Sequence, residues 1–348
     1  MQRNRLLGLA RDGALTAAAA GLIVSLAAPG RADDTSYVQG LINSAAAHGG
    51  VARLAAKTYN VSNLEMKSGV KLFLPAGCVL NLTNGSLKSS DVAHIAITGR
   101  GTINQLFNNA FPLDFVNVDD FLVSGITVHG FRWNGQGDWP AGRRGGYFTD
   151  PCWHCTRGVF SGVTIDSDKG TQWTDGLDLS NCHDIKVVNC RFSVGDDGVS
   201  VKAFSHTTSM GGEPFTGGSS HITVTGCTFA NSHGMPMGIG DETFQPITDI
   251  TFANNIVTQA VDGPYKLWIA GAGQSDWLAK DNHEASDPPA PVTHVYYSHN
   301  TGCGADSPSS ISFKPGGRPP SDVYFNGKPL TSLKTGGGKV VALLNGGA

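Results

Sequence analysis

The chain has 348 residues and a formal net charge of −3, with 15% charged residues and 46 glycines. This small charge excludes a broad electrostatic attraction to nucleic acid, so an anionic ligand would have to be held by local groups. The glycine-rich, modestly charged composition excludes a disordered chain and is typical of a turn-rich β protein.

The first stretch is expected to be a targeting signal and not part of the fold. Arg3 and Arg5 precede an apolar run from Leu15 to Ala28, and small residues around Ala32 offer a cleavage site. This order predicts a secretory signal peptide over residues 1–32, and hence a secreted or periplasmic protein. The run is shorter than the roughly 20 residues that span a bilayer, so no membrane anchor is expected. Residues 33–348 remain as one domain.

Residues 35–50 predict one amphipathic helix. Thr35 or Ser36 can cap its start, apolar residues recur at helical spacing, and Gly49-Gly50 ends it. A solenoid exposes its core at each end, so a helix here is expected to serve as a cap.

From Val51 onwards the chain repeats one unit: a polar or turn residue, a short alternating strand, an Asn or Gly turn and another short strand. Clear copies begin near His94, Phe121, Val159, Ile185, Ile222, Ile250, Val295 and Val323. Repeats of this length that contain only strands and turns predict an all-β parallel β-helix, whose rungs stack about 4.8 Å apart. A β-sandwich would use similar strands without repeating one motif in register.

The most informative repeat lies between residues 173 and 240. Asp175-Gly176-Leu177 aligns with Asp197-Gly198-Val199, 22 residues further on. In a third copy, counted from the preceding strands, His233 takes the position of Asp196. Stacked copies place these side chains on one face of the solenoid.

Crowded carboxylates on one face indicate acid–base chemistry. Repulsion should raise the pKa of at least one of them, and a protonated acid beside an ionised base can hydrolyse a glycosidic bond. Two other interpretations remain: a Ca²⁺ site made of oxygen ligands, or solvated turn aspartates. The turn interpretation fits Asp178 and Asp184 well, and Asp175, Asp196 and Asp197 poorly.

Longer segments and cysteines give weaker signals. The loops at 132–155, 205–219 and 271–291 carry aromatic residues suited to stacking on sugar rings: Trp133, Trp139, Tyr147, Trp153 and Trp277.

Cys190 and Cys227 occupy equivalent rung positions and could form a disulfide or stack as small core groups. The isolated Cys152/Cys155 pair predicts a local disulfide or a loop staple.

Taken together, Trp173-Thr174-Asp175-Gly176, Gly195-Asp196-Asp197-Gly198, Ser232-His233-Gly234 and a later Lys266 resemble the polygalacturonases of glycoside hydrolase family 28. The resemblance is strongest over residues 156–273. It implies a right-handed, single-stranded parallel β-helix and inverting hydrolysis with no metal or cofactor. It also implies that Asp196 is the general acid, that Asp175 and Asp197 activate water, and that His233 supports protonation of the acid.

The substrate is less sharply indicated. Trp173 replaces the usual Asn of the family, and the usual Arg-Ile-Lys is Pro264-Tyr265-Lys266, so the lysine is kept and the arginine is lost. Expected substrate-binding residues are Lys266, Tyr265, Trp173 and Trp268. The predicted function is an exported hydrolase of α-linked uronide polysaccharide of the pectin or polygalacturonate type. We expect a monomer with a polysaccharide substrate and no nucleic-acid or membrane partner.

Alternatives stay open at this point. The lost arginine leaves room for a rhamnogalacturonan or a neutral α-glucan such as dextran. A Ca²⁺-dependent pectate lyase and a non-catalytic β-helix adhesin are the other classes to consider.

Overall fold

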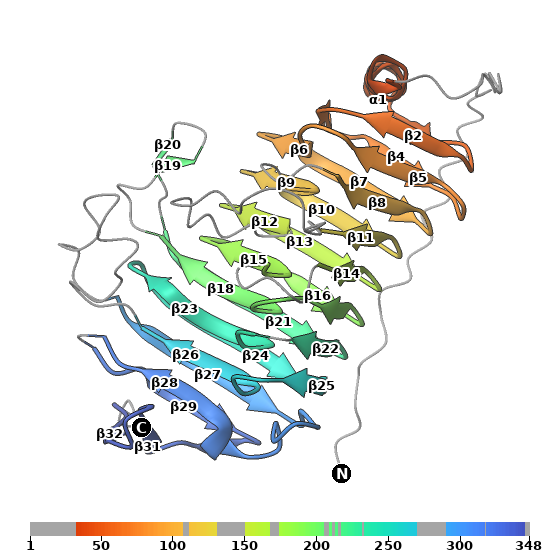
Figure 1. Ribbon diagram of the computed structural model, residues 1–348. Coiled ribbons are helices and arrows are strands. Elements are labelled where there is room, and N and C mark those ends of the chain that lie inside the picture. The colour runs from red at the N-terminus through yellow and green to blue at the C-terminus, as the bar shows by residue number, and fades with distance from the viewer. Residues whose placement is uncertain are drawn as a thin grey trace, which may run out of the picture.

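Three long parallel sheets run the length of the protein (Figure 1). The computed structural model describes residues 33–344 except for 107–110, 131–149, 168–173, 205–208, 211–212, 215–216, 232, 270–289 and 317. The expected signal peptide, residues 1–32, lies outside the described residues. Within the described part, each turn of chain through most of the solenoid contributes one strand to each sheet, as a parallel β-helix requires.

Sheet A contains β1 (Val51–Arg53), β4 (Lys71–Leu74), β7 (Ala93–Gly99), β10 (Asp119–Ser124), β13 (Thr156–Ser161), β16 (Lys186–Val188), β21 (Ser219–Thr225), β24 (Ile247–Ala253), β27 (Val292–Ser298), β29 (Ser321–Phe325) and β30 (Lys328–Pro329). Sheet B contains β2 (Thr58–Val61), β5 (Val79–Leu82), β8 (Thr102–Gln105), β11 (Thr127–His129), β14 (Thr164–Asp166), β17 (Arg191–Ser193), β22 (Thr228–Asn231) and β25 (Ile256–Ala260). Sheet C contains β3 (Leu64–Glu65), β6 (Leu87–Ser90), β9 (Leu113–Val116), β12 (Asp150–Trp153), β15 (Leu177–Ser180), β18 (Val199–Ala203), β23 (Met237–Thr243), β26 (Tyr265–Trp268) and β28 (Ile311–Lys314). Two antiparallel pairs stand apart, β19 (Ser209–Met210) with β20 (Glu213–Pro214) and β31 (Ser332–Lys334) with β32 (Val340–Ala342).

The strands form because apolar and polar residues alternate along them. In β24, Ile247, Ile250 and Phe252 are buried while the residues between them are partly exposed. Neighbouring rungs place like side chains on one another, so that Phe192 and Phe229 stack with centroids 5.0 Å apart. Such aromatic stacking adds to the free energy gained by burying the rings.

One corner of the solenoid carries a ladder of charged residues in the left-handed backbone conformation, which we call the αL ladder. It runs down sheet A through His94, Asp120, Arg157, Asp184, His221, Asp249, His294 and Asp322, all with φ between 50° and 57°. The sheet register places each member opposite the next, so nitrogen donors alternate with carboxylates at every step. His94 Nδ1 lies 2.7 Å from Asp120 Oδ2, and His221 approaches Asp184 at 3.7 Å and Asp249 at 3.8 Å.

Helix α1 (Thr35–His48) closes the N-terminal end, as expected (Figure 1). Val38, Ile42 and Ala45 are its buried residues, and Gly49 ends it in the left-handed conformation with φ 62°. The expected cap at Thr35 or Ser36 is wrong: Asp34 is the N-cap residue, without a side-chain cap bond. Its carboxylate instead accepts a hydrogen bond from Asn60 N–H at 3.0 Å, which ties the helix to the first rung.

The cysteines pack in the core without crosslinks. None of the seven forms a disulfide, and all except Cys303 are buried. The expected Cys152–Cys155 disulfide is therefore wrong. For Cys190 and Cys227 the stacking alternative holds, since Cys190 N–H donates to Cys227 Sγ at 3.4 Å. Among the described residues, we find no helix with the length and apolar character to cross a membrane.

Candidate active site

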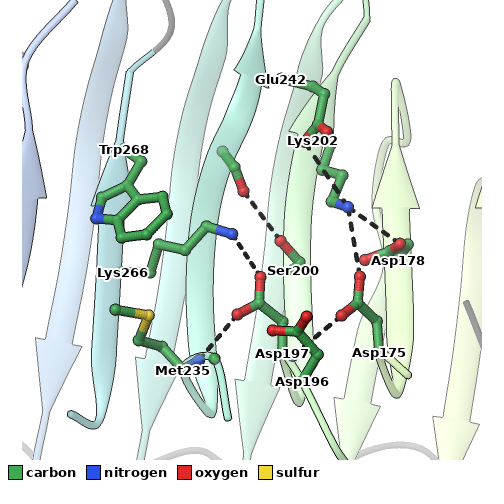
Figure 2. A network of polar contacts seen from close by, with 12 residues as sticks. Asp175, Asp178, Asp196, Asp197, Ser200, Lys202, Met235, Glu242, Lys266 and Trp268 are labelled. Carbon is green, nitrogen blue, oxygen red and sulfur yellow. Dashed lines mark hydrogen bonds and ion pairs between the residues drawn. The ribbon is translucent and has the colours of Figure 1, made fainter. Parts of the chain in front are cut away.

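The outer face of sheet C gathers polar side chains from successive rungs. In β15, Leu177 and Leu179 face the core, so Asp178 and Ser180 lie on the other face. The register sets Asp178, Ser200, Gly238 and Lys266 opposite one another in β15, β18, β23 and β26. Three of these four positions carry polar side chains, and Figure 2 shows Asp178, Ser200 and Lys266 together on this part of the sheet.

Asp175 and Asp197 precede β15 and β18, and the structure holds them by one repeated device. Asp197 N–H donates to Asp175 Oδ1 at 3.1 Å, and Met235 N–H donates to Asp197 Oδ1 at 2.8 Å. Each carboxylate thus accepts from the backbone of the equivalent residue one rung further on. The expected equivalence of Asp175 and Asp197 is confirmed by the Leu177–Val199 pairing.

The glycines after these aspartates allow the rungs to approach. A Cβ at Gly176 would lie 2.3 Å from Gly198 O, and one at Gly198 would lie 2.5 Å from Pro236 O. No side chain fits at either position. The Asp-Gly repeat read in the sequence is therefore a packing requirement as well as a chemical signal.

Asp196 lies half-buried at the turn before β18. Its N–H donates to Thr174 O at 3.2 Å, and its carbonyl accepts from the Asn231 amide. Gly234 lies against it, since a Cβ there would be 2.1 Å from Asp196 Oδ1. The segment after β22 is therefore packed directly on the Asp196 carboxylate.

His233 is half-buried beside Gly234. Among the described residues it makes no hydrogen bond or ion pair, so the structure shows no hydrogen bond between His233 and Asp196. In the β18–β23 register Val199 pairs with Met237, and extending this offset of 38 residues back sets Asp196 opposite Gly234, one residue after His233. The exact equivalence of His233 and Asp196 expected from the sequence is therefore wrong by one residue in sheet C, because the rung contains one more residue there.

Two buried lysines form ion pairs with the carboxylates of this face (Figure 2). Lys266 Nζ lies 2.6 Å from Asp197 Oδ2. Lys202 Nζ lies 3.1 Å from Asp178 Oδ2, 3.6 Å from Asp175 Oδ2 and 3.7 Å from Glu242 Oε2. Lys266 reaches Asp197 across Gly238, which has no side chain to block the path.

Burial dominates the electrostatics of this cluster. It raises the pKa of Asp175, an effect that Lys202 partly opposes and Asp197 reinforces. Burial also raises the pKa of Asp178 well above its ordinary range, and Lys202 only partly offsets it. For Lys202, burial lowers the pKa, but the surrounding carboxylates, Asp178 first, raise it well above the ordinary value. These directions favour the charged form of Lys202 and the protonated form of Asp178.

Sequence reasoning missed three of these groups. Asp178 was interpreted as a solvated turn residue, which is wrong: it lies within β15 and is fully buried. Lys202 and Glu242 were not considered. Lys202 could have been found by alternation, because it follows the inward Val201 and so faces the same side as Asp178.

The expected substrate residues lie in different environments. Trp268 is half-buried on the outer face, with Lys266 Nζ 5.0 Å and Lys314 Nζ 4.0 Å from its ring centroid. Tyr265 instead faces the core, fully buried, and its hydroxyl donates to Ala305 O at 2.6 Å. A substrate contact by Tyr265 is thus excluded in this structure. Trp173 lies outside the described residues, as do Trp133, Trp139, Tyr147 and Trp277, whereas Trp153 is buried against Phe204.

In the described part of the chain, no three His, Cys, Asp or Glu side chains are grouped so that they could hold a metal ion.

The fold of this chain is similar to that of solved polysaccharide hydrolases. An exopolygalacturonase from Thermotoga maritima matches 88% of this chain and 78% of its own, with a TM-score of 0.60 and 13% identity. An endo-xylogalacturonan hydrolase from Aspergillus tubingensis matches 90% of this chain and 93% of its own, with a TM-score of 0.55 and 16% identity. The expected right-handed parallel β-helix is confirmed. At these identities the likeness establishes the fold alone.

The sequence comparisons show a likeness to one family. The model for "Glycosyl hydrolases family 28" matches residues 152–274, the segment that contains the aspartates and Lys266. A polygalacturonase of Medicago sativa is 26% identical over 223 residues, 62% of this chain, and the chain spans 45% of that relative's length. The resemblance to family 28 is thus confirmed.

Proposed function

We propose that the chain is an exported glycoside hydrolase that cleaves α-linked uronide polysaccharide of the polygalacturonate type by inverting hydrolysis. The observation that carries the proposal is the coupled pair Asp175 and Asp197, each held by the backbone of the next rung, with Asp196 on the intervening turn. Inversion and export rest on the family resemblance and on the expected leader.

The roles follow from the environment of each group. Lys266 Nζ lies 2.6 Å from Asp197 Oδ2, and this ion pair holds in place the carboxylate that would take a proton from an attacking water. Asp196, half-buried beside Gly234, would give a proton to the glycosidic oxygen as the bond to the leaving sugar breaks. Asp175, hydrogen-bonded to the backbone of Asp197, would share the water-activating role.

A uronide substrate is supported by the positive charge beside Trp268. Two ammonium groups, from Lys266 and Lys314, lie over its ring. A flat aromatic surface suits a sugar ring, and neighbouring ammonium groups suit its carboxylate. Lys314, one rung beyond Lys266, supplies a cation on the face where Pro264 replaces the family arginine.

The test is product analysis on polygalacturonate, rhamnogalacturonan and dextran, with and without chelator. We expect new reducing ends on polygalacturonate, an inverted anomer by proton NMR, and no effect of chelator. Cleavage of only dextran or rhamnogalacturonan would overturn the substrate class. Ultraviolet-absorbing unsaturated products that require Ca²⁺ would indicate a lyase, and binding without cleavage an adhesin.

The matched variant for this test is Asp196→Asn, which keeps shape and polarity but cannot donate the proton. Turnover should fall about 10²–10⁴-fold, the usual worth of general acid catalysis, while the melting temperature stays near wild type. Near-normal turnover would refute the assignment of Asp196.

A further inference from the structure

Lys202 lies among three acidic side chains. The family resemblance gives it neither a catalytic nor a substrate-binding role. It is carried by β18, five residues after Asp197, and its side chain is buried. Its ammonium lies within 3.7 Å of Asp175, Asp178 and Glu242, which come from the turn before β15, from β15 and from β23. A buried lysine that connects three adjacent strands has a fixed position.

The charges of this group do not balance if every acid is ionised. One ammonium would face three buried carboxylates, which is costly in a poorly solvated site. Asp178 is fully buried, and no described residue hydrogen-bonds to its Oδ1. Its pKa is raised well above the ordinary range by burial, so Asp178 is the acid that keeps its proton. Asp178 Oδ2 then serves Lys202 as a hydrogen-bond acceptor.

The charge of Lys202 is then shared by Asp175 and Glu242. Asp175 also faces the neighbouring Asp197, whose negative charge opposes its ionisation, and more distantly Lys266, whose charge favours it. Lys266 is itself bound to Asp197 at 2.6 Å. The two carboxylates at equivalent rung positions therefore each have one lysine.

We propose that Lys202 is a positioning residue that keeps the Asp175 carboxylate ionised and fixed on the outer face of sheet C. This role rests on the proposed hydrolase function, and Lys202 itself contacts no substrate. Asp178 and Glu242 hold the ammonium in place, so that it stays beside Asp175.

Loss of Lys202 should shift the acidic limb of the pH–activity profile. Removing the ammonium raises the pKa of Asp175, because Lys202 is the main group that lowers it. If catalysis needs ionised Asp175, activity is lost as pH falls through that pKa, so the limb moves to higher pH. An opposite charge at this range lowers a carboxyl pKa by about 1–3 units, and because Asp178 and Glu242 share the ammonium we expect a shift in the lower part of that range, about one to two pH units.

The experiment compares Asp178→Asn with Lys202→Met/Asp178→Asn. The double variant lacks both the ammonium and the most deeply buried acid, so it avoids the excess buried acid that could unfold Lys202→Met alone. The acidic limb of kcat/KM on polygalacturonate should lie about one to two units higher in the double variant. Lys186→Met, which removes an exposed lysine of β16, should leave the limb where wild type has it.

An unmoved limb in the double variant would overturn the role of Lys202. If wild type cleaves none of the polysaccharides, the proposed function fails, and a second measurement tests Lys202 separately. In protein with ¹³C-labelled aspartate, the Asp175 carboxyl signal is identified by its loss in Asp175→Asn. Its titration midpoint should be higher in the double variant than in Asp178→Asn, and equal midpoints would overturn the proposal.

Discussion

At the scale of single residues, Asp178 should make stability depend on pH. Its pKa is raised well above the ordinary value of 3.8 by burial, so the folded protein binds this proton more tightly than the unfolded chain. The stability it contributes is fully present below about 3.8 and is lost as pH rises through the folded pKa. Asp178→Asn cannot titrate. Its melting temperature relative to wild type should therefore increase from acidic to neutral pH.

The control for this prediction is Asp184→Asn, which alters an exposed aspartate of the αL ladder. Its melting temperature relative to wild type should change much less with pH. A flat difference for Asp178→Asn over the same range would show that Asp178 does not hold the proton.

Lys266 has two tasks in the proposed site, and one substitution can separate them. Lys266→Met leaves Asp197 buried without its ammonium, so kcat should fall on any substrate. On polygalacturonate KM should also rise, by about tenfold or more, because the uronate loses a cationic partner. On methyl-esterified polygalacturonate only kcat should fall. Steady-state kinetics on both polymers checks this, and an equal rise of KM on both would contradict the uronide contact.

The site residues could be predicted from sequence only where the repeat displays them. Asp175 and Asp197 recur with the same neighbours, so alignment of the copies found them. Tyr265 was misplaced although the same alignment sets it beside the inward Leu177 and Met237, which was enough to predict burial. Glu242 could not be found in this way, because β23 changes register against β18 between Val201 and Ala203.

At the scale of elements, Gly240 fixes how β23 meets β26. Its φ is +88°, and a Cβ there would lie 1.7 Å from Trp268 O, a backbone atom that cannot move aside. Gly240→Ala should cost about 1 kcal/mol for backbone strain and about 2 kcal/mol or more for the displaced strand. Gly162 has φ +63° and open space around it, so Gly162→Ala should lower the free energy of unfolding only by the backbone strain, about 1 kcal/mol. Urea denaturation compares the two, and equal losses would show that the contact with Trp268 does not matter.

Sheets A and B were predictable because β-branched alternation and Asn or Gly turns mark their strands. The strands of sheet C beside the site also alternate, as Leu177-Asp178-Leu179-Ser180 of β15 does. What the sequence did not show is that the polar side chains of β15 are buried as well, because burial on both faces depends on the residues of neighbouring rungs. The helix was predicted to within two residues, whereas its cap was not, because Asp34 is engaged by Asn60 across the first rung.

At the scale of the whole molecule, the αL ladder makes the number of rungs matter. A solenoid tolerates gain or loss of a rung because each rung contacts only its neighbours. Here, however, nitrogen donors and carboxylates alternate along the αL ladder, so removal of one rung places two groups of the same kind opposite each other. Deleting residues 157–183 would set Asp120 on Asp184, whereas deleting 157–220 would set Asp120 on His221.

Opposite charges along the αL ladder therefore stay paired only when an even number of rungs is gained or lost. Such a protein should change length more easily by two rungs than by one. Exposed pairs are worth only about 0.2–1 kcal/mol each, so the preference is a bias and not a barrier. Added salt should stabilise the one-rung deletion by screening its two carboxylates and should do little for the two-rung deletion. The free energy of unfolding of the two deletion variants, measured at low and at high salt, would show this difference. The same salt response in both variants would mean that charge pairing along the αL ladder does not depend on the number of rungs.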